Sequence, residues 1–308
     1  MTTEPRLPAR IEFRAIDGVL LLDKSSGYSS NASLQKARRL LRARKAGHTG
    51  SLDPLASGLL PVCLGDATKF SGFLLNTDKR YTVRIRLGSE TDTADSEGTV
   101  TGVWPIPPLT ESILESVLQG FRGEGEQIPP MYSALKHQGQ RLYDLARKGV
   151  EVRREPRPIT IHELRLESFD EGTLDLDVHC SKGTYIRVLA EDIGRALGCG
   201  GHVEILRRTA VGRLDVRDAV TLDDLEQMSE TDRTARLLAG DVMLTDLPAI
   251  ELETALASRI RNGVRVALST PDLSGWVRIY GPGNEFMGLG EVMPDGTLAP
   301  RRLVSQST

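Results

Sequence analysis

The sequence contains few cysteines and histidines, and none of them is grouped as a metal site or a disulfide framework requires. The three cysteines, Cys63, Cys180 and Cys199, are scattered over a chain of 308 residues. No Cys-x-x-Cys pair occurs, so neither a disulfide framework nor a zinc site is predicted, and we expect three buried, reduced thiols. The five histidines are equally dispersed, which argues against a metal centre.

Long apolar runs are also missing from the chain. No window approaches the roughly 18 uninterrupted apolar residues that a membrane helix requires. Residues 1–14 are polar and lack the apolar core of a secretory signal. These two absences predict a cytoplasmic protein. The length suits about two domains of roughly 150 residues each, or one large domain with a small appendage.

The chain also lacks a net positive charge. The formal net charge is −3 and the pI is about 6.0, which is unusual for a protein that neutralises phosphates. Acidic residues at 222–232 nevertheless compensate for a basic run that contains no acid. Alone, such a run is more often a solvated helix face, but its place before the loop described next favours a guide for phosphates. The run contains Lys36, Arg38, Arg39, Arg42, Arg44 and Lys45.

The most informative segment is the loop at residues 47–58, with the sequence Gly-His-Thr-Gly-Ser-Leu-Asp-Pro-Leu-Ala-Ser-Gly. It holds one acidic side chain, Asp53, among glycines and otherwise uncharged residues. Glycine lets a backbone approach a ligand closely, and the ring of Pro54 stiffens the turn after Asp53. For an isolated Asp-Pro pair, an Asx turn would be the simpler interpretation. The motifs elsewhere in the chain favour a functional loop.

Five motifs, in order along residues 18–210, resemble those of the TruB family of tRNA pseudouridine synthases. The loop at 47–58 resembles the catalytic motif of that family. The N-terminal motif departs from the family at Ser25, where proline is usual, but it keeps Lys24 and Gly27. The other four motifs are Leu-Leu-Asp-Lys-Ser-Ser-Gly at 21–27, Asp-Lys-Arg-Tyr at 78–81, Gln-Ile-Pro-Pro-Met-Tyr-Ser-Ala at 127–134 and Gly-Thr-Tyr-Ile-Arg at 183–187.

Hydrophobic periodicity predicts the elements that carry these motifs. Apolar residues alternate with polar ones at 81–87 and 174–180, which indicates half-buried strands, and Tyr81 shares the inward parity. An apolar run at 18–23 indicates a buried strand. A helix capped by Ser30 or Asn31 follows it, and a second helix runs to Leu197 with Arg187 in its first turn.

The strands lie in runs without a βαβα rhythm, so the catalytic region is predicted to be α+β with a mixed, largely antiparallel sheet. The resemblance implies the pseudouridine synthase fold over residues 1–247. It also implies that the basic, proline-containing excursion at 124–157, called the thumb below, closes on RNA. Short strands and glycine-rich turns after residue 248 predict a small β-barrel, and residues 248–308 resemble a PUA-type RNA-binding domain.

The chemistry that the resemblance implies is the isomerisation of a uridine in the T-arm of tRNA, at position 55, without a cofactor or metal. Asp53 is the expected nucleophile, since a carboxylate can attack the sugar or the base. A buried carboxylate alone would become protonated, so a cation must keep it ionised. Arg187 is the expected partner, through a planar, forked pair. Tyr81 is the candidate acceptor of the C5 proton.

The remaining candidates bind the substrate. The uridine must be flipped out of its stack, and Tyr81 and Tyr185 can supply a flat surface for it. Either tyrosine could instead be ordinary core. His48, whose simpler role is to stabilise a turn, Leu206 of the uracil pocket and Lys24 complete the substrate-binding set. The expected contacts to the RNA backbone are Arg38, Arg42 and Lys45.

Two other functions compete with this interpretation. A non-catalytic tRNA-folding chaperone would use the basic helix, the thumb and the barrel, but it leaves Asp53 and Arg187 unexplained. A carboxylate-dependent hydrolase would need a second acid about 5 to 10 Å away. The acids at 92–97 fail the spacing of a calcium loop and are expected to form a solvated turn. The sequence therefore favours a stand-alone, monomeric tRNA pseudouridine synthase.

Overall fold

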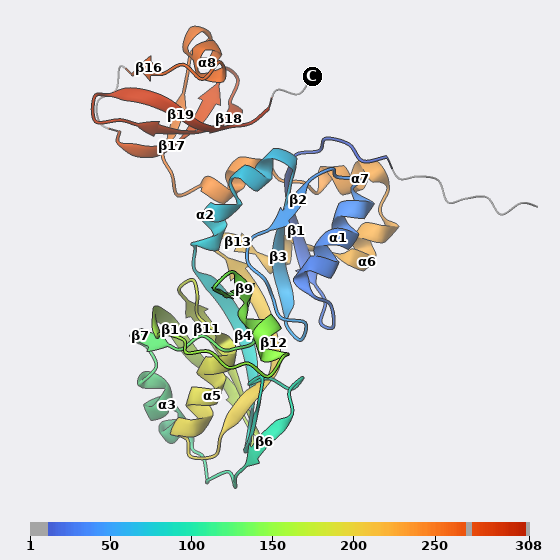
Figure 1. Cartoon of the computed structure of the whole chain (residues 1–308), viewed down its shortest axis with the longest axis vertical. Coiled ribbons are helices and arrows are strands. Elements are labelled where there is room, and N and C mark those ends of the chain that lie inside the picture. Colours follow the sequence, from blue (N-terminus) through green and yellow to red (C-terminus); the bar gives the residue numbers. More distant parts are fainter. Residues whose placement is uncertain (1–11, 269–272, 306–308) are drawn as a thin grey trace, which may run out of the picture.

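A computed structural model describes residues 12–268 and 273–305 of the chain, so most of the polar N-terminal segment discussed above lies outside the described residues. The described chain forms one large and one small β-sheet in separate parts of the molecule, joined by the segment that follows η3 (Gly240–Leu244) (Figure 1). No helix in these ranges is both long enough and apolar enough to cross a bilayer.

The larger sheet has ten strands and carries the predicted motifs. Along its main path the order is β14 (Val220–Thr221), β1 (Gly18–Lys24), β3 (Ser57–Leu64), β12 (Gly201–Val211), β4 (Lys79–Leu87), β11 (Thr173–Cys180), β10 (Arg157–Phe169) and β7 (Gly123–Gln127). Off this path, β2 (Ala46–His48) pairs with β3, and β13 (Leu214–Asp215) pairs with β12. Among the described strands of this sheet, β1–β14 and β12–β3 are the parallel pairs, which confirms a mixed, largely antiparallel sheet.

The two faces of this sheet differ in chemistry, as the alternation in β4 predicts. Val83 and Ile85 are buried on the inner face. The helices α1 (Ser30–Leu40), α3 (Glu111–Gln119) and α5 (Ile186–Ala196) contribute buried leucines to the same core. On the outer face, Arg84 and Arg86 pair with Asp175 and Glu204 on the neighbouring strands. Around β4 the inner face is therefore apolar and the outer face carries ion pairs, whereas β1 and β3 are apolar on both faces, with Val19, Leu21 and Leu59 in a second core.

The basic run enters α1 and the turn after it. Ser29 caps this helix, one residue before the predicted caps, because its hydroxyl accepts a hydrogen bond from the Ala32 amide at 3.1 Å. The helices α6 (Leu222–Gln227) and α7 (Glu230–Ala235) carry the acidic segment and lie beside α1 (Figure 1). Lys36 pairs with Glu226 and Arg42 with Glu230, so part of the basic run is neutralised within the protein.

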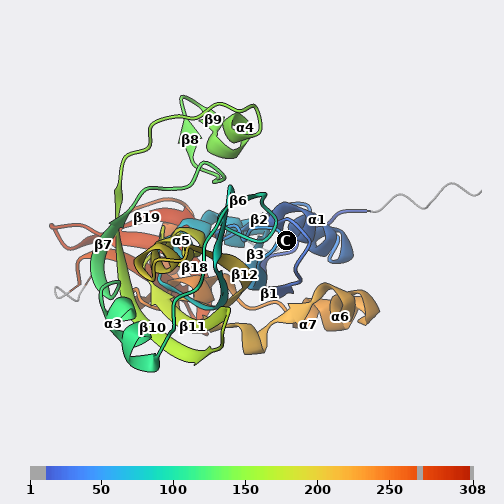
Figure 2. The ribbon, with the colours of Figure 1, turned by 90° about the horizontal axis from the view of Figure 1, so that it is seen from below.

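The thumb leaves the sheet after β7 and returns along β10. In between it forms a short hairpin, β8 (Lys136–His137) and β9 (Gln140–Arg141), and the helix α4 (Leu142–Ala146). Figure 2 shows this segment standing off one face of the larger sheet. Since β7 and β10 pair between Gln127 and Arg157, both ends of the predicted thumb belong to the sheet.

The smaller sheet has the order β15 (Ala249–Glu251), β17 (Gly275–Gly281), β18 (Glu285–Val292), β19 (Thr297–Leu303) and β16 (Val266–Ala267). With α8 (Thr254–Arg261) it encloses its own core, as expected of a PUA-like domain. It contacts η1 (Gly65–Lys69) and α2 (Ser71–Leu75) of the catalytic part: the rings of Phe73 and Trp276 lie 5.8 Å apart. The remaining elements are β5 (Ser89–Thr91), β6 (Val100–Val103) and η2 (Val216–Asp218).

Candidate active site

Asp53 lies in the loop between β2 and β3, and the start of α1 holds this loop in place. The Ser30 hydroxyl donates to the Leu52 carbonyl at 2.9 Å and accepts from the Leu52 amide at 2.7 Å. The Ala56 amide donates to the Asp53 carbonyl at 3.1 Å. The side chain of Asp53 keeps 43% of its surface accessible. The carboxylate is therefore fixed in position and still reachable by a substrate.

Arg187, in the first turn of α5, binds Asp53 and two other segments at once. Its Nε lies 2.9 Å from Asp53 Oδ2, and only 5% of its side chain is exposed. Nη1 donates to the Thr93 carbonyl at 2.9 Å, and Nη2 donates to the Tyr132 carbonyl of the thumb at 2.7 Å. The predicted pair is present, but the predicted fork is wrong, because the other two nitrogens bind backbone carbonyls.

Asp95, which was expected in a solvated turn, is a second carboxylate at this site and, unlike Asp53, it is buried. It is 3% exposed, and its Oδ2 lies 3.7 Å from Arg187 Nε. Its Oδ1 accepts from the Thr93 hydroxyl at 2.6 Å and from the Glu97 amide at 3.1 Å. The expectation of a solvated turn holds for Asp92 and Glu97, which are exposed, but it is wrong for Asp95.

Asp53 is harder to ionise than an ordinary aspartate. Burial raises the pKa of its carboxyl, and the charge of Arg187 opposes this rise while the charge of Asp95 adds to it. Arg187 is thus shared between two acids and offsets the desolvation of Asp53 only in part. The environment therefore disfavours the ionised form of Asp53, and Arg187 is the main group that stabilises this form.

Lys24 was expected to contact the substrate, but the structure gives its ammonium group other partners. Its side chain is completely buried. Nζ donates to the carbonyls of Ser25, Tyr28 and Pro54, at 2.9, 2.7 and 3.3 Å. Burial lowers the pKa of Lys24 to about 8, and the charge of Asp53 opposes this change. Lys24 therefore ties its own loop to the residue after Asp53.

The expected walls of the base pocket surround the same loop. Tyr81 on β4 is half-buried, and Leu206 on β12 is 6% exposed. Tyr185 precedes α5, and Gln127 holds its backbone through bonds of 2.9 and 3.3 Å. Burial raises the pKa of both tyrosine hydroxyls, and the nearby charge of Asp53 adds to the rise. Burial lowers the pKa of His48, which favours its neutral form.

The candidate contacts to the RNA backbone differ in how freely they can bind a phosphate. Arg38 uses all three guanidinium nitrogens within the protein, on Ala43, Gln35 and Arg44, so the structure does not support it as a phosphate ligand. Arg42 pairs with Glu230 at 3.4 Å. Lys45 is exposed and, within the described residues, has no carboxylate within 4.0 Å.

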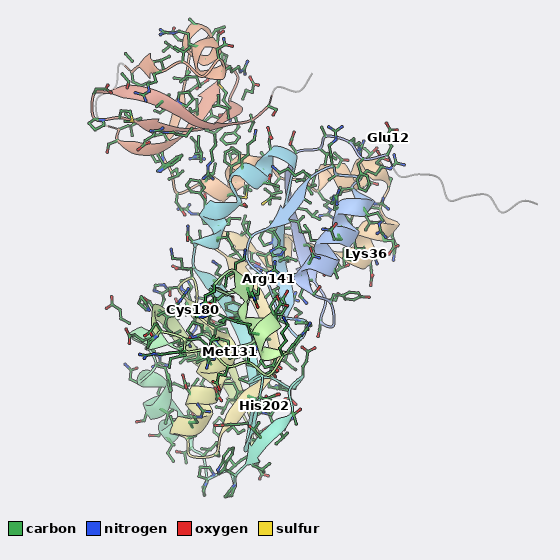
Figure 3. The ribbon with its side chains drawn as sticks, in the orientation of Figure 1. Glu12, Lys36, Met131, Arg141, Cys180 and His202 are labelled. Carbon is green, nitrogen blue, oxygen red and sulfur yellow. The ribbon has the colours of Figure 1, made fainter. Side chains whose placement is uncertain are left out.

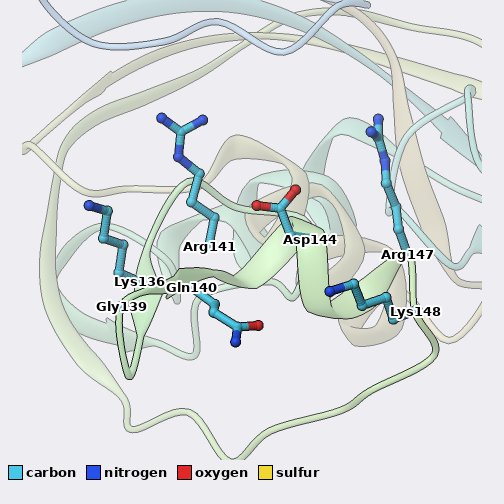
Figure 4. Close-up of a pocket in the computed structure, with 7 residues that line it drawn as sticks. All are labelled: Lys136, Gly139, Gln140, Arg141, Asp144, Arg147 and Lys148. Atoms are coloured by element: carbon cyan, nitrogen blue, oxygen red, sulfur yellow. The ribbon is translucent and has the colours of Figure 1, made fainter.

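A second group of cations lies in the thumb. They line a pocket of about 600 Å³ (Figure 4). Figure 3 shows Arg141 of this part of the thumb in front of the larger sheet, and Figure 2 shows the same segment standing off the sheet. The guanidinium groups of Arg141 and Arg147 lie 5.7 and 5.6 Å from the centre of the Tyr143 ring. The side chains at the pocket are Lys136, Gln140, Arg141, Asp144, Arg147 and Lys148, with the backbone of Gly139.

In the described part of the chain, no group of three or more His, Cys, Asp or Glu side chains is placed to hold a metal ion. All three cysteines are buried and unpaired, as expected.

Comparisons with known proteins agree over most of the chain. Residues 38–186 match the TruB family pseudouridylate synthase N-terminal domain, residues 187–247 the tRNA pseudouridylate synthase B C-terminal domain, and residues 248–304 the C-terminal domain of pseudouridine synthase II TruB. The chain is 52% identical to tRNA pseudouridine synthase B of Nitrosococcus oceani, covering 97% of this chain and 98% of that protein. It is also 52% identical to the protein of the same name from Methylobacillus flagellatus, covering 96% and 97%.

Solved structures share the fold. A chain in the crystal structure of a Cbf5-Nop10-Gar1 complex matches with a TM-score of 0.71 and 25% identity, over 94% of this chain and 84% of that one. A chain in the structure of an H/ACA RNP bound to a substrate RNA containing 2'-deoxyuridine matches with a TM-score of 0.70 and 22% identity, over 94% and 85%. The second match concerns the fold alone.

Proposed function

The chain belongs to the TruB family and is a tRNA pseudouridine synthase, and we propose that it isomerises the T-loop uridine at tRNA position 55 without a cofactor. The observation that carries this proposal is the contact of 2.9 Å between Asp53 and a buried arginine that also faces Asp95. A nucleophilic carboxylate held in this way is what the isomerisation requires.

The reaction conserves all atoms and electrons. The bond between N1 of uracil and C1′ of the ribose breaks, the base turns, and C5 joins C1′. The proton on C5 leaves and N1 gains a proton, so no group is lost and nothing is oxidised. The protein must therefore supply a nucleophile, a proton acceptor and a pocket in which the detached base can turn.

Asp53 is the proposed nucleophile. Within the described residues, Arg187 is the one side chain that binds its carboxylate, through Oδ2 at 2.9 Å, so Oδ1 is left for the substrate. Attack on C1′ or on the base forms a covalent intermediate that consumes the negative charge of Asp53. Arg187 orients the carboxylate before the attack and stabilises it when it leaves.

The base pocket is proposed to consist of Tyr81, Tyr185, Leu206 and His48. Because a stacked uridine cannot reach Asp53, the nucleotide must be flipped out, and the aromatic faces and Leu206 hold it. Tyr81 accepts the C5 proton after C5 has joined the sugar. His48, in its neutral form, contacts the base or fills the space that the base leaves in the T-loop.

The RNA backbone is proposed to lie along Lys45 and the cations of the thumb pocket, with a weaker contribution from Arg42. Arg38 is not included among these contacts, because each of its three guanidinium nitrogens already donates a hydrogen bond to a protein oxygen. The residues from 248 onward are proposed to form a separate PUA-like domain that adds a second RNA contact. We further propose that the enzyme acts in the cytoplasm as a monomer, without a protein partner.

The alternative of a purely tRNA-folding chaperone is less well supported. Such a protein needs cations on its surface, but it has no use for two carboxylates that share one buried guanidinium. Keeping charges in this environment costs stability, which proteins commonly accept at active sites.

The test uses the purified chain alone on unmodified tRNA transcripts labelled with tritium at C5 of uridine. The proposal predicts the release of one tritium per tRNA and no release from a transcript with cytidine at position 55. Release that persists in the cytidine transcript would contradict the assigned position. No release from either transcript would contradict the stand-alone activity.

A further inference from the structure

Arg208 is the largest fully buried side chain among the described residues, with 2% of its surface exposed. It lies on β12, where the two halves of the larger sheet meet. In the registers of these strands, Arg208 is directly opposite Gly58 of β3 and directly opposite Tyr81 of β4. Directly opposed residues on paired strands share a face of the sheet, so the guanidinium and the phenol project to the same side.

The guanidinium of Arg208 donates hydrogen bonds to the backbone of the Asp53 loop and of the strand that follows it. Nε donates to the Leu59 carbonyl at 2.8 Å, and Nη2 donates to the Gly50 carbonyl at 3.1 Å. Nη1 lies 3.5 Å from the Ser51 carbonyl. Gly50 and Ser51 belong to the Asp53 loop, and Leu59 belongs to the strand after it. One side chain therefore ties both ends of the loop to β12.

Glycine at position 58 makes this arrangement possible. Its φ is +101°, and a Cβ atom there would lie 2.2 Å from the carbonyl oxygen of Arg208. A side chain at this position would push β3 away from β12, so the close approach of the two strands depends on its absence. Gly58 thus allows β3 to lie close to the backbone of β12 at Arg208.

The charge of Arg208 has no acidic partner. Within the described residues no carboxylate oxygen lies within 4.0 Å of its guanidinium, and the three acceptors of its hydrogen bonds are neutral carbonyls. A guanidinium does not lose its proton inside proteins, so this positive charge is permanent. A buried charge without a counter-ion is costly, and at an active site this cost calls for a functional explanation.

The ionisable groups around Arg208 respond to this charge. Burial raises the pKa of Tyr81, and the charge of Arg208 opposes the rise, whereas Cys180 on β11 and Asp53 add to it. Burial lowers the pKa of Lys24, His48 and Lys79, and Arg208 lowers each of them further. Among these neighbours, Tyr81 is the group whose charged form is favoured by Arg208. Tyr81 is also the group that is proposed to accept the C5 proton.

We infer that Arg208 is a positioning residue that fixes the Asp53 loop from behind and holds the Tyr81 oxygen beside a permanent positive charge. This inference rests on the proposed function. In the final step the C5 proton moves to the Tyr81 oxygen, the electrons of the C5–H bond restore the ring, and the phenol then returns a proton to water. A tyrosinate beside the guanidinium accepts the proton, which is why a cation without a counter-ion is useful here.

The experiment compares Arg208→Met and Arg208→Lys with the wild type and with Arg207→Met. Arg207 is a matched control because it is the next residue on the same strand, but its guanidinium binds Asp23 at 2.9 and 2.6 Å. Circular dichroism checks folding and filter binding measures the Kd for tRNA. Single-turnover rates are measured from pH 6 to 10 on tRNA that carries hydrogen or deuterium at C5 of uridine.

We expect Arg208→Met to lower the rate at saturating tRNA by about 100-fold, with a Kd within about threefold of the wild type. The part of the pH profile in which the rate increases with the ionisation of Tyr81, called the alkaline limb here, should move to higher pH in Arg208→Met. The isotope effect of this variant should grow, because removal of the proton from C5 becomes harder. Arg208→Lys should be slower than the wild type but keep the wild-type limb, because it retains the charge. Arg207→Met should behave like the wild type.

A wild-type rate in Arg208→Met would overturn the inference. A slow Arg208→Met with an unchanged limb and isotope effect would also overturn it, since a merely structural role predicts that result. If Arg208→Met does not fold, Arg208→Lys tests the inference instead. A shift of the alkaline limb of the pH profile in Arg208→Lys would then contradict the inference. An inactive wild type would count against the proposed function and not against Arg208.

Discussion

The Asp53 pocket and the thumb use the same cationic residue types in opposite ways. In the pocket, Arg187 and Lys24 direct their donors to protein oxygens, and each is buried. In the thumb, Arg141, Arg147 and Lys148 are exposed and, within the described residues, have no carboxylate within 4.0 Å. The contrast teaches that buried cations bound to protein oxygens shape the reactive group, whereas exposed cations without an acidic partner are available to the RNA.

This contrast also explains how a chain with a net charge of −3 can bind tRNA. The arginines on the outer face of the larger sheet are matched by acids, as are Lys36 and Arg42 beside α1. Affinity for phosphates depends on the exposed cations that remain unmatched. Among the described residues, one group of these lies in the thumb and a second beside α1, namely Lys136, Arg141, Arg147 and Lys148 in the thumb, and Arg39, Arg44 and Lys45 beside α1. Changes in the pocket should therefore alter the rate, and changes in the thumb should alter the affinity.

Among the variants that keep Asp53, the largest effect is expected for Arg187→Lys. An ammonium group cannot reach Asp53, Thr93 and Tyr132 at the same time, so the carboxylate loses its orientation. The single-turnover rate at saturating tRNA should fall by about 100-fold or more, with the Kd nearly unchanged. The control is Arg195→Lys, an exposed residue of the same helix that binds Glu90 and Glu191. Equal rates for the two variants would contradict the claim that the buried cations of the Asp53 pocket control the rate.

Asp95→Asn should have the next largest effect. Loss of this charge removes one of the two acids that share Arg187, so the rate should fall by about 10-fold or more. Because the charge of Asp95 raises the pKa of Asp53, the acid limb of the pH–rate profile should move to lower pH. The exposed Asp92→Asn serves as the control. An acid limb that moves upward in Asp95→Asn would contradict the assigned electrostatics.

A smaller effect, confined to binding, is expected when the thumb loses Arg141, Arg147 and Lys148 to glutamine. The Kd should rise by about 10-fold and its slope against log salt should fall by roughly 2, with the rate at saturating tRNA unchanged. The matched control replaces Arg84, Arg86 and Arg165, which changes the net charge equally but removes cations that already have acidic partners. The same loss of affinity in both triple variants would show that net charge alone governs binding.

The smallest effect is expected beside α1. Lys45→Ala should weaken tRNA binding by about threefold, as expected for one phosphate contact. Arg42→Ala should weaken it less, since Arg42 is paired with Glu230. A filter-binding titration at two salt concentrations compares the two variants. A larger effect for Arg42→Ala would mean that the ion pair opens when RNA binds.

Much of this structure could be predicted from the sequence because it depends on local periodicity. The alternation at Tyr81–Leu87 identifies β4, and the turn at 181–184 places Arg187 in the first turn of α5. Asp53 stands out because its loop contains no other charge. These signals lie within a few residues of the groups that they identify.

The features that were missed depend on long-range contacts. Asp95 faces inward because its segment bridges to Val203 of β12, and no periodicity marks this bridge. Lys24 is buried by the Tyr28 and Pro54 carbonyls, so its motif alone does not separate substrate binding from support of the loop. The role of Arg38 likewise depends on carbonyls of the turn after its helix.

The central claim is that Asp53 performs the chemistry while other residues bind the tRNA. The most direct test compares tritium release from C5-labelled tRNA by the wild type and by Asp53→Asn, with the Kd of both measured on the same transcript. The account predicts that Asp53→Asn binds tRNA within about threefold of the wild type but releases tritium at least about 1,000-fold more slowly. Turnover above about one per cent of the wild-type rate would contradict the nucleophilic role of Asp53.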